Sequence, residues 1–154
     1  MTSQALLREL NHDVWTPFRN AYRDLDAPAF LALHSPDLIR VVAATGEIRD
    51  HAGHTTDITS FFRRVADHGD EIAIEFRFTE RTASPTAAGE RGLFRITVRR
   101  GGTRDQAHGR FHVFSRKTDR WRILVDHEAD EDDTAAAEAF TTAVHQDDVA
   151  AFAR

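Results

Sequence analysis

The chain has 154 residues, 41% of them hydrophobic and 29% charged, which fits one globular domain with one core. Its net charge of −5 excludes the broad basic face that nucleic acids and anionic membrane surfaces select, so we expect neither as a partner. Cysteine is absent, which excludes disulfides, thiol catalysis and thiolate metal sites. The chain shows neither a signal-type start nor an apolar run of about 20 residues, so we expect a cytoplasmic protein.

The first half of the chain predicts helices with two short strands between them. Residues 3–25 carry apolar side chains three and four positions apart, which is typical of a helix. Pro17 indicates either a kink in that helix or the first turn of a second helix capped by Thr16. The next elements, in order, are a helix over 27–34, strands over 38–42 and 47–49, and a helix over 56–67 that Thr55 or Thr56 can cap.

The second half predicts long antiparallel strands with one apolar face. Residues 71–83 and 91–100 alternate strictly between apolar and polar, and Gly101-Gly102 is typical of a tight hairpin. Further strands follow over 104–117 and 121–128. A twisted sheet of this length, covered on one side by the helices, encloses a conical hollow, so we predict an α+β fold in which a curved antiparallel sheet surrounds a pocket.

The end of the chain is predicted to be separate from this sheet. Residues 1–130 form the pocket domain, and 131–154 form an acidic linker and an extra C-terminal helix. That helix is expected over 134–153, with apolar positions at Phe140, Val144 and Phe152, and its apolar side requires docking on the same chain or on a partner.

Two segments resemble a known family. They are WTPFRNAYRDLDAPAFLALHSPDLIRV, the helix pair that leads into the first strand, and GRFHVFSRKTDRWRILVDHEAD, the last hairpin with its closing Asp-His. In this order they resemble the nuclear-transport-factor-2-like superfamily, the cone-shaped fold of ketosteroid isomerases and polyketide cyclases, and within it the small SnoaL-like and calcium/calmodulin-kinase-association-like domains. The resemblance implies a base near Val42 and an oxyanion hole containing a Tyr and a protonated Asp. Val42 cannot accept a proton, and no Asp stands in mid-strand over 107–116 to partner Tyr22, so the chain departs from the isomerase pattern.

His127 and Tyr22 are the candidate catalytic residues. Alternation from Trp121 directs His127 into the concave face and Asp126 outward, and a His in an apolar cavity can transfer protons. The alternative for His127 is a structural hydrogen bond to buried backbone. Trp15 and Tyr22 lie two helical turns apart on one face, where they either contact a ligand at the pocket mouth or simply pack the helix on the sheet.

The other candidate ligand-binding residues come from the predicted strands and from the helix over 56–67. Arg40 could hold a ligand carboxylate in the cavity or instead pair with Asp37 or a neighbouring strand. The predicted aromatic lining consists of Phe62, Phe76, Phe94 and Trp121. No metal site is expected, because His108 and His112 are too far apart along one strand, and the pair His51 and His54 lacks a third ligand.

These features predict a protein that binds a small apolar molecule in the cone pocket. It is either a binding protein or a cofactor-independent enzyme of the isomerase, dehydratase or cyclase type. The alternative is a non-catalytic association module that forms a homodimer. Its contact surface would be the outer sheet face, with a lone Phe among cationic side chains at Arg95, Arg99, Arg110, His112, Phe114 and Arg116.

Overall fold

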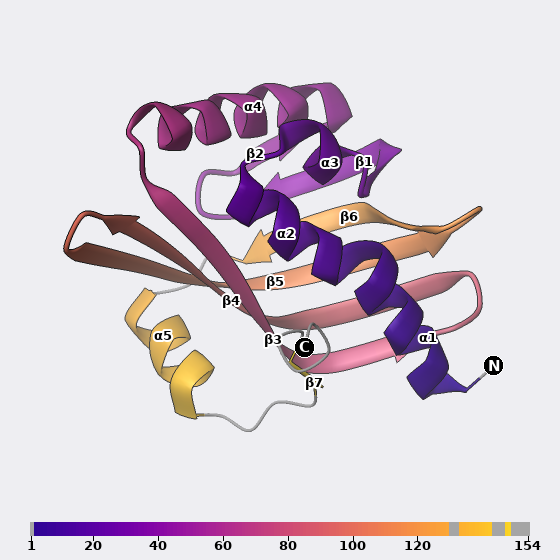
Figure 1. Ribbon diagram of the computed structural model, residues 1–154. Helices are drawn as coiled ribbons and strands as arrows, with labels where there is room; N and C mark the ends of the chain where they lie inside the picture. Colours follow the sequence, from indigo (N-terminus) through magenta and orange to yellow (C-terminus); the bar gives the residue numbers. More distant parts are fainter. Residues whose placement is uncertain (1, 130–132, 143–146, 149–154) are drawn as a thin grey trace.

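The computed structural model describes residues 2–129, 133–142 and 147–148. Helices and strands segregate as predicted, and the fold is α+β with a curved sheet (Figure 1). The helices are α1 (Ser3–Leu10), η1 (Asn11–Trp15), α2 (Thr16–Asp24), α3 (Ala27–Leu31), α4 (His51–Asp67) and α5 (Asp133–Thr142). The strands are β1 (His34–Val42), β2 (Glu47–Arg49), β3 (Glu71–Ala83), β4 (Ala87–Arg100), β5 (Thr103–Lys117), β6 (Trp121–Ala129) and β7 (Asp147–Asp148). The sheet order is β2-β1-β6-β5-β4-β3-β7.

The N-terminal helical segment crosses the concave face of the sheet (Figure 1). It runs from α1 to α2 through η1, one widened π-helical stretch, rather than breaking into two separate helices at Pro17. Pro17 has no N–H to donate to the carbonyl of Asp13, and the guanidinium of Arg120 donates to that oxygen at 3.2 Å instead. The hairpin between β5 and β6 therefore contacts the helical segment at its π-helical stretch.

The core fills the space between this segment and the concave face. Ile72, Ile74, Phe76 and Phe78 of β3 are buried there, and Phe94 of β4 packs against them, which confirms the predicted alternation of both strands. The apolar stripe of the helix supplies Leu10, Val14 and Trp15, each no more than 1% exposed.

One irregularity in β6 decides which of its side chains face the cone. Phe114 pairs with Val125 and Ser115 pairs with Ile123, so Leu124 is an extra residue in β6. A bulge of one residue reverses the direction of every later side chain on the strand, because the side-chain period is two. Trp121 and Ile123 face the core before the bulge, and Asp126 and Glu128 face the concave side after it.

Helix α4 begins earlier than expected. Asp50 is its N-cap, with its carboxylate accepting from the backbone N–H of Gly53 at 2.8 Å, so the predicted start at Thr56 is wrong by a little more than one turn. The added turn carries His51 and His54, which brings His54 into the core at 4% exposure.

The tail packs on the convex face, opposite the cone. In α5, Phe140 is 1% exposed, and the guanidinium groups of Arg77 and Arg95 stack on its ring at 4.3 and 4.6 Å from the centroid. Leu93 of β4 is buried beneath the helix. The expected docking on the same chain is thus confirmed, but a helix over 134–153 is wrong, because α5 ends at Thr142 and β7 pairs with β3. The predicted apolar positions 144 and 152 lie outside the described residues.

Candidate functional site

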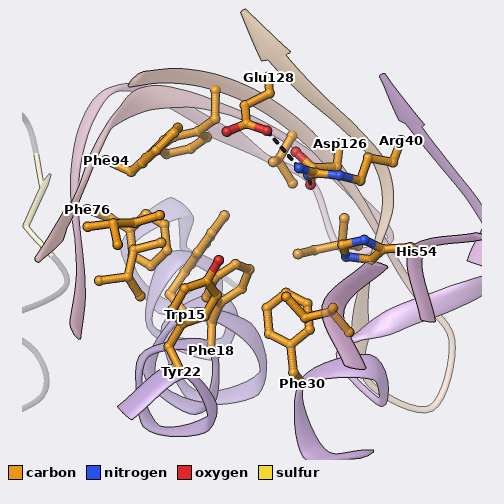
Figure 2. A pocket seen from close by; sticks show the side chains of 16 residues that line it. Trp15, Phe18, Tyr22, Phe30, Arg40, His54, Phe76, Phe94, Asp126 and Glu128 are labelled. Atoms are coloured by element: carbon orange, nitrogen blue, oxygen red, sulfur yellow. Dashed lines mark hydrogen bonds and ion pairs between the residues drawn. The ribbon is translucent and has the colours of Figure 1, made fainter. Parts of the chain in front are cut away.

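A cavity lies between the N-terminal helix, α4 and the concave face of the sheet (Figure 2). Its volume is about 80 Å³. On this scale one water occupies roughly 10–15 Å³, so the cavity holds several water molecules or one small organic molecule. Aromatic rings dominate its wall: Trp15, Phe18, Tyr22, Phe30, Phe76, Phe94 and Phe111.

The polar part of the wall is an ion cluster between two parallel strands. Arg40 of β1 donates from Nη1 to Oδ2 of Asp126 at 2.6 Å and from Nη2 to Oε2 of Glu128 at 2.7 Å. Arg40 pairs with Asp126 in the β1–β6 ladder, so the backbone register itself brings the charges together. Burial lowers the pKa of Arg40, but the two carboxylates together raise it above its usual value. The guanidinium therefore stays charged and holds both carboxylates in place.

The Tyr22 hydroxyl points into the cavity from α2 (Figure 2). Its ring is sandwiched by stacking on Phe18 and edge contact with Phe62. Burial raises the pKa of Tyr22 far above its usual value, with the positive charge of Arg40 opposing the shift. The phenol consequently remains protonated at neutral pH and can donate a hydrogen bond to a ligand.

His54 faces the same cavity from α4. Neither ring nitrogen has a hydrogen-bond partner among the described residues. Burial, helped by His34 and Arg40, lowers the pKa of His54 to about 3, so its imidazole is neutral at physiological pH. Behind it, His34 donates from Nδ1 to the carbonyl of Phe30 at 3.0 Å, and burial lowers its pKa to about 4.

A second buried ion pair holds the aromatic wall in place from behind. The side chains of Arg81 and Glu90 are fully buried, with 2.7 Å between Nε and Oε2. Glu90 also accepts from Nε1 of Trp15 at 3.1 Å, and Arg81 donates to the amide oxygen of Asn11 at 2.7 Å. Trp15 thus cannot offer its N–H to a ligand without leaving Glu90 short of a donor, so it acts as an apolar wall.

Five of the predicted site residues meet in this cavity: Trp15, Tyr22, Arg40, Phe76 and Phe94. Arg40 meets both expectations, since it lines the cavity and pairs with a neighbouring strand, although its partners are on β6 while Asp37 pairs with Arg116. Phe62 and Trp121 are buried core residues that do not line the cavity. The indole of Trp121 instead packs under α1, where its N–H donates to Glu9 at 3.2 Å.

The predicted orientation of His127 is wrong. The bulge at Leu124 turns His127 to the convex face, where it pairs in the ladder with His112, and it turns Asp126 inward. The inward-facing acidic residues and His54 were missed by the sequence reasoning. For Asp126 and Glu128, the signal in the sequence is their spacing. They lie two residues apart, on one face of a strand, and a neighbouring strand contains Arg40.

Comparisons with known proteins bear on the fold. No family model and no curated protein matches the sequence. The solved structures include an NTF2-like protein with a cystatin-like fold from Novosphingobium aromaticivorans (TM-score 0.66, 19% identity, 91% of this chain and 93% of that one). The chain has the NTF2-like fold. This agrees with the family resemblance of the two sequence segments.

Two further neighbours carry different functional descriptions. A candidate dehydratase of the NTF2-like family from Streptomyces avermitilis has a TM-score of 0.65 at 13% identity and covers 82% of this chain and 97% of its own. A candidate calcium/calmodulin-dependent protein kinase II association domain from Xanthomonas campestris has a TM-score of 0.58 at 15% identity and covers 76% and 82%. At such identities the NTF2-like fold is shared, and a function does not follow from it. Among the described residues no helix has the length and apolarity needed to cross a bilayer.

Proposed function

We propose that the cavity binds a small ring-containing molecule and that the protein is a cofactor-independent enzyme of the isomerase or dehydratase type. The supporting observation is the convergence of Tyr22, His54 and the Arg40 cluster on one small, otherwise apolar cavity. Such a cavity with a few convergent polar groups is the usual form of a small-molecule site.

Proton transfer would be divided between two walls. Asp126 or Glu128 accepts a proton from a carbon next to a carbonyl of the ligand, while Arg40 keeps the carboxylates oriented. The Tyr22 hydroxyl donates a hydrogen bond to the oxygen on which negative charge develops. Return of the proton to another carbon gives an isomer, and transfer of the same proton from the carboxyl group to a β-hydroxyl, which leaves as water as the C=C bond forms, gives a dehydrated product. The neighbour assigned as a dehydratase candidate is in keeping with this class.

The test is deuterium exchange in D2O, followed by proton NMR on small cyclic ketones and β-hydroxyketones. We expect the wild type to accelerate exchange at the carbon next to the carbonyl of at least one compound. The single substitution Asp126→Asn or Glu128→Gln should reduce the exchange rate by roughly 10²–10⁴-fold, the usual contribution of acid–base catalysis. Tyr22→Phe should reduce the exchange rate by a factor in the same range. His127→Gln, on the convex face, is the control and should leave it unchanged. Binding without exchange would contradict catalysis and leave a ligand-binding protein.

A second candidate function rests on the convex face. Ile39, Val125 and Phe114 are register neighbours on β1, β6 and β5, and Ile39 and Phe114 are 50% and 43% exposed. This apolar row would support a homodimer, as in an association module. Sedimentation equilibrium of the wild type and of Phe114→Ser tests it. A wild-type dimer that becomes monomeric in the variant is expected, and a monomeric wild type would contradict it.

A further inference from the structure

The formal charges of the ion cluster in the cavity do not sum to zero. Formal charges on the cavity wall are one positive, on Arg40, and two negative, on Asp126 and Glu128. His54, the wall residue outside the cluster that could carry a compensating positive charge, is held neutral by its burial. The wall therefore has one more negative than positive formal charge, on side chains that are 13% (Asp126) and 30% (Glu128) exposed, so a cation entering the cavity meets a partly desolvated negative charge.

The remaining wall is aromatic. Seven aromatic side chains surround the space, and a ring that turns its face to the cavity would attract an organic cation. His54 adds a hydrogen-bond acceptor, since a neutral imidazole always has one unprotonated nitrogen and neither nitrogen of this ring is satisfied by a described residue. This buried imidazole, 4% exposed, is a second feature that points to a ligand, independent of the carboxylates.

We propose that the natural ligand of this cavity is a small aromatic or cyclic amine that also carries a carbonyl, bound with its amine protonated. The ammonium group lies between one of the two carboxylates and His54, the other carboxylate remains the base, and the ring packs on the aromatic wall. This inference names the ligand class of the site described under the proposed function and rests on that function. It also reverses the expectation that Arg40 binds a ligand carboxylate, because both Nη atoms of its guanidinium already donate to carboxylates of the chain.

The test uses three probes of almost equal shape: benzylamine, benzyl alcohol and benzoate, which are positive, neutral and negative at pH 7. Isothermal titration calorimetry at physiological ionic strength measures the affinity of each. We expect benzylamine to bind on the order of tenfold more tightly than benzyl alcohol, and benzoate to bind most weakly. A benzyl alcohol or benzoate affinity equal to or above that of benzylamine overturns the inference and leaves the proposed function standing.

Variants locate the preference. Glu128→Gln makes the formal charge of the cavity zero while keeping the side-chain shape, so the preference for benzylamine should fall about tenfold and benzyl alcohol should bind as before. Asp126→Asn serves as the second variant if Glu128→Gln does not fold. Asp37→Asn removes an arginine-paired carboxylate outside the cavity, and it should retain the wild-type preference. An unchanged preference in both cavity variants would mean that the amine binds elsewhere, which overturns the inference. Failure of all three probes to bind contradicts both this inference and ligand binding by the cavity.

Discussion

Arg40 and Asp126 face each other across parallel strands, with 2.6 Å between Nη1 and Oδ2, and their side chains are 21% and 13% exposed. Because the pair is partly buried and shared with Glu128, removing the cation leaves two carboxylates without their donor. We expect Arg40→Met to lower the free energy of unfolding by about 2–3 kcal/mol. Urea denaturation measures the change.

The matched control for this substitution is Arg23→Met. Arg23 also pairs with a carboxylate, Asp24, but the two side chains are 64% and 57% exposed. An exposed pair contributes less than about 1 kcal/mol, so this variant should lie close to the wild type. Equal losses in the two variants would show that burial of the Arg40 cluster has no special effect.

The hydrogen bond between Trp15 and Glu90 predicts unequal effects of two Trp→Phe substitutions. Trp15→Phe leaves fully buried Glu90 short of a donor, so a loss of about 1–3 kcal/mol is expected. Trp121→Phe removes an N–H that donates to Glu9, whose side chain is 29% exposed, so water can replace it. Trp121→Phe should therefore lower the free energy of unfolding by less than Trp15→Phe does. Chemical denaturation measures the free energy of unfolding of both variants. A larger loss of this free energy in Trp121→Phe would contradict the assigned role of Glu90.

The two buried histidines predict loss of stability in mild acid. Their pKa values fall from 6.5 to about 3 for His54 and about 4 for His34 in the folded protein. The unfolded chain therefore binds more protons below pH 6.5, and the free energy of unfolding falls as the pH decreases from about 6.5 towards 4. Above pH 6.5 this contribution is fully present.

His54→Leu isolates one of these groups. The variant should show a shallower decrease in stability between pH 6.5 and 4 than the wild type, by thermal unfolding followed by circular dichroism. His12→Gln is the control, since the His12 side chain is 87% exposed, and its profile should follow the wild type. If His54→Leu retains the full acid sensitivity, His54 is not held neutral in the folded state.

Docking of α5 predicts that the tail stabilises the sheet without affecting the cavity. Phe140→Ala removes a ring that is buried between two guanidinium groups, so it should cost up to about 3 kcal/mol and speed proteolysis near α5. Thr141→Ala, at an exposed position, is the control. Because α5 lies on the convex face, affinity for a cavity ligand should not change in either variant. A changed affinity would contradict the separation of the two faces.

The sequence predicted the architecture because alternation and helical periodicity report burial directly. The inward faces of β3 and β4 and the nature of each main element followed from that signal. The site was predicted only in part. Alternation assumes an unbroken period of two, and one extra residue at Leu124 exchanges the positions of Asp126 and His127. Nothing in the residues around Leu124 marks the bulge, since Gly is absent from β6.

His54 was not predicted as a cavity residue for a different reason. Thr55, Thr56 and Asp50 all offer side-chain oxygens that can cap a helix, and local sequence does not decide among them. Tertiary packing selects Asp50, since the additional turn buries the ring of His54 against Phe30, with 5.6 Å between centroids. Contacts that are distant in sequence thus decided the composition of the site.

Binding of a small molecule in the cavity can be tested by a thermal-shift comparison of three proteins. Wild type, the cavity-filling variant Ile96→Phe and the convex-face variant His127→Gln are screened against small cyclic alcohols, ketones and amines. A compound present at 100 times its dissociation constant stabilises the fold by about 2.7 kcal/mol, which shifts the melting temperature by several degrees. We predict a rise in melting temperature in the wild type and in His127→Gln. The rise should be absent in Ile96→Phe, because the introduced phenyl ring occupies the cavity that Ile96 lines. Shifts of equal size in all three proteins, or in none, would contradict binding in the cavity.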